Sequence, residues 1–141
     1  MRKRQNGHAA VIERRGADVE LLMEEIRSEI HDRAWPSRPD VRLVTHVPPV
    51  DLEPTELKEL LTDLVWASLG DPQAIGAKAL VSGRDDGTTV IFSVVSGREH
   101  AFNNGYDIGK ARAIAAKNHG RLWVDQSGST VYTSFQKSGR H

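Results

Sequence analysis

The chain has 141 residues, a length typical of one domain. Its 19 lysine and arginine residues balance 19 aspartate and glutamate residues, which argues against a protein whose main task is to bind the phosphate backbone of nucleic acids. The absence of cysteine excludes disulfides, thiolate metal sites and a cysteine nucleophile. No apolar run approaches the roughly 20 residues that span a bilayer, so we expect a cytoplasmic protein with neither a membrane nor a nucleic-acid partner.

The first third of the chain predicts a short strand, a helix and a second strand. Residues 9–13 (Ala-Ala-Val-Ile-Glu) predict a short strand within an N-terminal tail, residues 1–16. Asp18 can cap a helix whose apolar residues follow at steps of three and four, which defines one buried face. A proline-rich stretch ends this helix, and alternating apolar residues over 41–47 predict a half-buried strand.

Two helices and two hairpins are predicted for the rest of the chain. Pro54 suits the first turn of the second helix, and an alanine-rich stretch predicts a third helix over 106–118, with Gly120 as its C-terminal cap. An Asp-Gly pair and a Gly-containing turn mark the hairpins. The hairpin strands are predicted at residues 77–82 with 89–95, and at residues 121–125 with 130–135.

These elements together predict an α/β fold. The order of helices and strands favours a two-layer α/β sandwich, in which three helices cover one face of a mixed sheet of about five strands. We expect one folded domain over residues 17–136, preceded by the N-terminal tail and followed by a short tail, residues 137–141.

Three segments resemble a known family. Residues 110–124 (Lys-Ala-Arg-Ala-Ile-Ala-Ala-Lys-Asn-His-Gly-Arg-Leu-Trp-Val) are similar to the part of sensor histidine kinases in which a helix ends at His-Gly-Gly and a strand opens with Arg-Ile-Trp-Val. Residues 128–135 resemble the Gly-Ser-Thr-Phe-Thr-Phe ending of that family, and residues 59–68 stand where it has its asparagine-box helix. From about residue 17 to residue 135, the chain therefore resembles the ATP-binding domain of these kinases, the GHKL or Bergerat fold.

The resemblance is poorest where the family binds its nucleotide. Asp63 and Ala67 stand at two asparagine positions of the helix, and the second asparagine helps to hold Mg²⁺ in the family. Alanine offers no oxygen ligand to a hard cation. Val95 stands at the aspartate that accepts a hydrogen bond from adenine, a bond that valine cannot make, and only Gly97 of that glycine box is kept.

The second glycine box departs in the same way. Gly105 is kept, but Asp107 replaces a glycine and would place a carboxylate beside the phosphate groups. An acidic residue there also suits the first turn of a helix. Only seven residues separate Gly97 from Gly105, so the segment that forms the ATP lid is missing. The resemblance thus implies a degenerate domain, a pseudokinase with neither ATP nor Mg²⁺ as cofactor and no metal site.

Other residues suggest a binding role and one alternative chemistry. Trp66, Arg98 and Lys110 are candidate contacts for a protein partner or an anion. His31 and Asp32 match part of the spacing of a kinase phosphoacceptor motif, in which a carboxylate orients the imidazole nucleophile. An exposed polar residue at a helix end is the competing interpretation of His31.

The leading hypothesis is a domain that acts in two-component-type signalling through protein interaction, with a response regulator, a kinase or a second copy as partner. Two alternatives remain open. The first is a divergent histidine kinase catalytic domain that still binds ATP and Mg²⁺ through Asp63, Gly97 and Gly105. The second is a phosphotransfer protein that uses His31.

Overall fold

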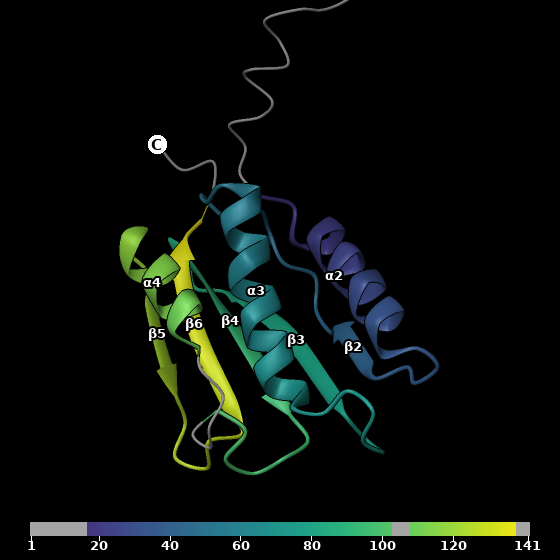
Figure 1. The fold of residues 1–141 in the computed structure, drawn as a ribbon. Helices are drawn as coiled ribbons and strands as arrows, with labels where there is room; N and C mark the ends of the chain where they lie inside the picture. The colour runs from purple at the N-terminus through teal and green to yellow at the C-terminus, as the bar shows by residue number, and fades with distance from the viewer. Residues whose placement is uncertain (1–16, 103–107, 138–141) are drawn as a thin grey trace, which may run out of the picture.

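The computed structural model describes residues 17–102 and 108–137, and Figure 1 shows their arrangement. The predicted strand at residues 9–13 lies outside them. The described helices are α2 (Val19–Ala34), α3 (Pro54–Leu69) and α4 (Gly109–Lys117). The described strands are β2 (Asp40–Leu43), β3 (Lys78–Asp85), β4 (Thr89–Ser96), β5 (Arg121–Val124) and β6 (Thr130–Gln136).

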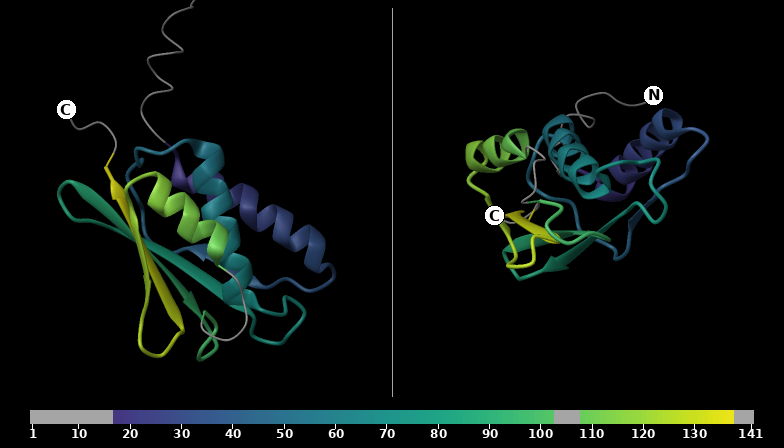
Figure 2. Two further views of the ribbon diagram at one scale, coloured as in Figure 1. Left: turned by 60° about the vertical axis from the view of Figure 1, so that its left-hand side comes forward. Right: turned by 60° about the horizontal axis from the view of Figure 1, so that its bottom comes forward.

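The five strands form one mixed sheet. Their order is β2-β3-β4-β6-β5, with β2 parallel to β3 and every other pair antiparallel. The three helices lie on one face of this sheet, and no helix of the described residues covers its other face, as the two views of Figure 2 show. The predicted two-layer α/β sandwich is confirmed. None of the helices described by the structure is long and apolar enough to cross a membrane.

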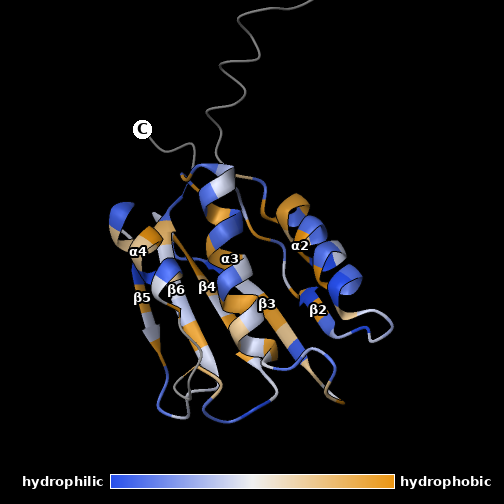
Figure 3. Cartoon of the chain, viewed as in Figure 1, coloured by the Kyte–Doolittle hydropathy of each residue, from blue (hydrophilic) through white to orange (hydrophobic). Residues whose placement is uncertain are grey.

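The hydrophobic core lies between the helices and the sheet. The central helix α3 supplies most of its leucines, and alternate residues of β4 supply Val90, Phe92 and Val94, all fully buried. Figure 3 shows apolar and polar residues alternating along the helices, as expected for helices packed on one side only. Burial of this apolar face holds the helix layer on the sheet.

Helices α2 and α3 begin at the predicted residues. The Asp18 carboxylate accepts a hydrogen bond from the Leu21 backbone N–H at 3.2 Å and begins α2. Pro54 occupies the first turn of α3, where its missing N–H costs no hydrogen bond. Helix α4 begins at Gly109 and is shorter than the predicted 106–118.

Two further details of the prediction are wrong. Strand β2 ends at Leu43 because the Thr45 hydroxyl, rather than the backbone, pairs with Gly83: it donates to the Gly83 carbonyl at 3.0 Å and accepts from the Gly83 N–H at 2.9 Å. Gly120 is also not the left-handed cap of α4. His119 takes that conformation, with φ 61°, and the Gly120 N–H bonds to the Ala115 carbonyl at 2.8 Å.

Candidate functional site

Asp63 on α3 caps the beginning of α4. Its Oδ2 accepts a hydrogen bond from the backbone N–H of Ala111 at 3.0 Å. The residue before α4 is Ile108, whose side chain makes no capping hydrogen bond. The first N–H groups of a helix need external acceptors and favour negative charge. A carboxylate from the neighbouring helix meets that need here, at the kind of helix terminus that commonly binds phosphate.

Arg98 binds the C-terminal end of α3. Its Nη2 donates to the Ala67 carbonyl at 3.0 Å and lies 3.5 Å from the Ser68 carbonyl. A cation at a helix C-terminus interacts favourably with the helix dipole. Gly70 leaves room for the guanidinium, because a Cβ at Gly70 would lie 2.6 Å from the Arg98 Nη2.

The last residue of β4 and the residues after it are hydrogen-bonded to the turn between β5 and β6. We call residues 96–102 the strap. The N–H groups of Ser96, His100 and Phe102 donate to carbonyls of the turn between β5 and β6, each at 2.9 Å. Ala101 and Phe102 are buried at its end, with exposed fractions of 0% and 5%. The short segment between the two glycine boxes is therefore packed down on the domain as far as Phe102.

The alternation of β4 places Ser96, rather than Val95, on the helix side of the sheet. Val95 is half-buried on the outer face, whereas Ser96 is buried in the same row as Val94. The Ser96 hydroxyl donates to the Ser68 carbonyl of α3 at 2.7 Å. Sequence reasoning missed Ser96, although the period-two pattern of the buried residues in β4 could have identified it.

The other residues that align with the nucleotide site of the family lie on α3, after β4 or outside the described residues. Ala67 is buried, with an exposed fraction of 2%, and offers only its methyl group and its carbonyl, which accepts from Arg98. Gly97 lies exposed directly after β4. Gly105 and Asp107 fall outside the described residues. In the parts of the chain that the structure describes, no three His, Asp or Glu residues are placed to hold a metal ion.

A shallow groove crosses the outer surface of the helices, with a volume of about 350 Å³. Trp66 is half-buried in it, and the Arg33 guanidinium carbon lies 5.9 Å from the centre of the Trp66 ring, a cation–π contact. We call it the helix groove; it brings Asp63, Trp66 and Lys110 together, whereas Arg98 does not line it. Its lining residues are Glu29, Arg33, Lys58, Glu59, Thr62, Asp63, Trp66 and Lys110.

His31 makes a structural contact. Its Nε2 lies 2.9 Å from the carbonyl oxygen of Pro39, and because a carbonyl only accepts, this nitrogen carries the proton and donates it. The ring is half-buried and joins α2 to the segment before β2. The nitrogen is thus engaged within the fold, whereas a phosphoacceptor imidazole must be exposed.

A second link joins α3 and α4 at their other ends. Glu56, in the first turn of α3, accepts hydrogen bonds from Lys117 and, at 3.2 Å, from the Asn118 Nδ2. These bonds hold the pKa of Glu56 below its usual value, with the Lys117 bond as the larger cause, and they raise the pKa of Lys117. Together with Asp63, Glu56 fixes α4 antiparallel to α3.

Solved structures of histidine kinase catalytic domains share this fold. The nucleotide-free catalytic domain of the histidine kinase ThkA is 18% identical, with a TM-score of 0.64, over 86% of this chain and 95% of that one. The ATP-binding domain of PrrB from Mycobacterium tuberculosis is 14% identical, with a TM-score of 0.60, over 88% and 96%. ThkA in complex with the response regulator TrrA gives 18% identity and a TM-score of 0.66 over 86% of this chain and 41% of that chain.

These likenesses establish the fold and agree with the resemblance in the sequence. No protein-family model matches the chain, and no curated protein matches it. At these low identities, the fold is shared but the residues of the site must be judged one by one.

Proposed function

We propose that the chain is a histidine-kinase-like ATPase domain that binds no ATP and acts in two-component-type signalling through protein interaction. The observation that carries this proposal is the hydrogen bond from the Ala111 N–H to Asp63, because it provides α4 with its own anion. A nucleotide phosphate approaching this helix terminus would have to displace a carboxylate or lie beside it, and like charges repel.

The other site positions support the same conclusion. Ala67 supplies no side-chain oxygen for Mg²⁺, and Arg98 bonds to the carbonyl of that residue. Ser96 faces the helices at the end of β4, but its hydroxyl is already bonded to α3. The described residues therefore do not suit a magnesium nucleotide, and we derive no phosphoryl-transfer step for this domain.

The helix groove is the surface we assign to the partner. It combines a large aromatic side chain, Trp66, with nearby cations and carboxylates, and aromatic residues flanked by polar groups are typical of interaction sites. The histidine kinase ThkA, part of which shares this fold, has been solved in complex with a response regulator. We therefore propose a response-regulator receiver domain as the partner that binds the helix groove.

The test is direct binding of purified receiver domains from the source organism to the full chain, measured by calorimetry. We expect one or more to bind, and we expect Trp66→Ala and Lys110→Glu to weaken binding at least tenfold. Trp123→Ala is the matched control, because Trp123 stacks on Tyr132 away from the helix groove. Failure of every receiver domain to bind, or equal binding by all the variants, would contradict the assignment.

A further inference from the structure

The face of the sheet that no described helix covers carries two stacked aromatic side chains. The rings of Trp123 on β5 and Tyr132 on β6 have centroids 5.5 Å apart and planes inclined by 18°. The Arg121 guanidinium carbon lies 5.7 Å from the centre of the Trp123 ring. Trp123 is 40% exposed, so these side chains present aromatic surface to solvent rather than to the core.

The two rings line a small cavity on the outer face of the sheet, with a volume of about 210 Å³. Strand β4 lies between β3 and β6, so the cavity has one side formed by each of these two strands and a floor formed by β4. We call it the sheet slot: Tyr132 and Trp123 line one side, Ser82 and Arg84 the other, and Ile91 and Ser93 lie between them.

The sheet slot has room for one planar ring. The backbones of β3 and β6 are two strand spacings apart, about 9.6 Å. Aromatic rings stack with centroids about 4.5–7 Å apart, and a guanidinium lies within about 6 Å of a ring that it contacts. A ring that stacks on Tyr132 therefore comes within reach of Arg84. The volume is smaller than the about 300 Å³ at which pockets for drug-sized ligands begin, which favours a single side chain as the occupant.

The outer face of the sheet offers positive charge beside this slot. The outward positions of β3, β4, β6 and β5 include Lys78, Arg84 and Arg121 but no Asp or Glu. Asp86 and Asp125 lie beyond the strand ends, and Asp125 is hydrogen-bonded within its own turn. Among the residues that the structure describes, neither Arg84 nor Arg121 forms an ion pair.

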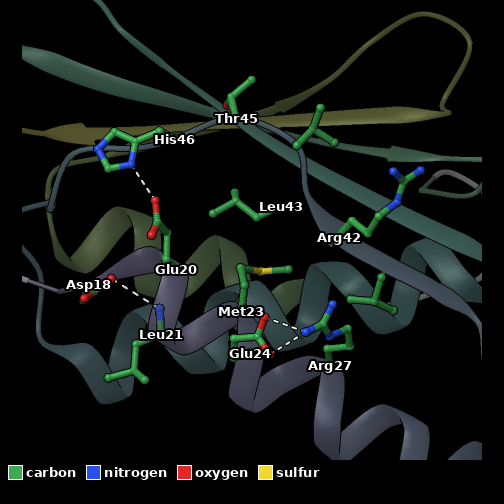
Figure 4. A pocket seen from close by; sticks show the side chains of 12 residues that line it. Asp18, Glu20, Leu21, Met23, Glu24, Arg27, Arg42, Leu43, Thr45 and His46 are labelled. Atoms are coloured by element: carbon green, nitrogen blue, oxygen red, sulfur yellow. Dashed lines mark hydrogen bonds and ion pairs between the residues drawn. The ribbon is translucent and has the colours of Figure 1, made fainter.

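A larger cavity, between α2 and β2, lacks this property. It has a volume of about 650 Å³, but Figure 4 shows its Glu20 bonded to His46 and its Arg27 bonded to Glu24. A charged ligand would have to compete with these pairs. Cations without an ion-pair partner, placed beside aromatic surface, are thus a feature of the sheet slot and not of this cavity.

The charge of the sheet slot argues against the chain itself as its occupant. Residues 1–16 carry five basic residues and one acidic residue, and residues 137–141 carry two basic residues and no acidic one. A second copy that presented the same face would also bring arginines against arginines, and like charges repel. The occupant that the charge favours is therefore an external anionic group.

The spacing of the arginines favours an acidic protein segment over a nucleic acid. A nucleic acid strand carries a phosphate at every nucleotide, and surfaces that bind single strands follow it with a continuous positive groove. Arg84 and Arg121 lie at opposite ends of one row of paired residues, three strand spacings or about 14 Å apart. Two separate cations with aromatic rings between them suit a short segment with a carboxylate on each side of a ring.

We propose that the sheet slot binds an aromatic side chain flanked by carboxylates, on an acidic segment of a partner protein. The ring of the partner stacks on Tyr132, and the carboxylates pair with Arg84 and Arg121. Aromatic residues and arginine are also the residues that most often dominate the binding energy of protein interfaces. The sheet slot and the helix groove lie on opposite sides of the domain, so the inference does not depend on the receiver-domain partner or on the absence of ATP binding.

The experiment is a titration of the isotope-labelled full chain with the peptide Glu-Asp-Glu-Phe-Glu-Asp-Glu at low salt, followed by two-dimensional NMR. At millimolar peptide we expect shifts of the Trp123 indole N–H and of the amides of residues 82–84, 91–93 and 132. Replacing the peptide's Phe by Leu, or its acidic residues by Lys, should weaken binding at least tenfold. Absence of shifts at the sheet slot, or equal binding of the Leu peptide, would overturn the inference.

Variants of the chain localise the binding. Tyr132→Val, which keeps a residue suited to a strand, and Arg84→Glu, at an exposed position, should each weaken binding of the Phe peptide at least tenfold. The matched controls are Trp35→Val and Arg38→Glu, at exposed positions outside the sheet slot, and both should bind like the unsubstituted chain. Equal binding by all four variants would contradict the assignment. Tighter binding of a short uridine oligonucleotide than of the Phe peptide would also overturn it, in favour of a nucleic acid.

Discussion

Asp63 and Arg98 both bind backbone groups at helix termini, and each supplies the charge that its terminus favours. The two side chains thus act as internal ligands. Neither role is visible in the sequence, because Asp63 lies 48 residues before the N–H that it caps and Arg98 lies 31 residues after the carbonyl that it binds.

We predict that Asp63→Ala destabilises the domain by about 1 kcal/mol, the usual cost of removing a helix-capping acceptor. Asp63→Asn should lose less than half of that, since the amide oxygen still accepts a hydrogen bond. The measurement is urea unfolding followed by circular dichroism. Asp32→Ala, at an exposed aspartate of α2, is the control, and an equal loss in that variant would show that the cap contributes nothing specific.

Gly120 provides a second test at the residue scale. A Cβ at this position would lie 2.5 Å from the Ser134 carbonyl oxygen and 2.6 Å from the Phe135 ring. Overpacking of this kind costs about 1–3 kcal/mol, so Gly120→Ala should lower the free energy of unfolding by that amount. Gly97→Ala should cost less, because its Cβ would meet the flexible Lys78 side chain at 3.1 Å and the Gly76 carbonyl oxygen at 3.5 Å, an ordinary contact distance. Equal losses in the two variants would refute the close-approach explanation.

At the scale of elements, α4 is held antiparallel to α3 by one contact near each end. Asp63 binds the first turn of α4, and Glu56 binds Lys117 and Asn118 at its last turn. The contact at Glu56 depends on an ionisable carboxylate, so the packing of α4 on α3 should depend on pH.

The folded state lowers the pKa of Glu56, so the unfolded chain binds this proton more readily as the pH falls. The stability that Glu56 contributes is present above its unfolded pKa of about 4.3 and is lost as the pH falls through the lower pKa of the folded state. We predict that Glu56→Gln flattens the fall in melting temperature between about pH 5 and pH 3. An unchanged pH profile would show that the contact contributes no stability.

Sequence patterns predicted each described element, because helix and strand periodicities reflect burial on one face. They placed boundaries less well. The strand predicted to reach Val47 ends at Leu43, since the Thr45 side chain takes over the pairing with Gly83. The cap expected at Gly120 falls at His119, since Gly120 is required instead for its close approach to β6.

The candidate site was predicted less completely than the fold. The motif alignment selected Asp63 and Ala67, which both lie on α3, and Val95, which faces the outer side of the sheet; it did not select Ser96, which faces the helices. A motif states which residue types occur together, whereas the face of the sheet is determined by the two-residue alternation of the strand. Contacts between distant segments, such as Arg98 with α3, need the three-dimensional structure.

At the scale of the whole molecule, the domain keeps the architecture of a histidine kinase catalytic domain, while its own side chains bind the helix termini around the nucleotide-site positions. A net charge of zero and the aromatic helix groove favour association with another protein over long-range attraction of an anionic nucleotide. We therefore propose, as the central claim, that this fold is used for binding a partner and not for binding ATP.

The most direct test is a calorimetric titration of the full chain with Mg-ATP and with ADP, accompanied by a thermal melt. A ligand that binds only the folded state, at about 100 times its dissociation constant, stabilises by about 2.7 kcal/mol, so micromolar binding would raise the melting temperature measurably at millimolar nucleotide. We predict no heat of binding and no change in melting temperature at millimolar nucleotide. Micromolar, magnesium-dependent binding would contradict the account and would identify the chain as a divergent ATP-binding domain.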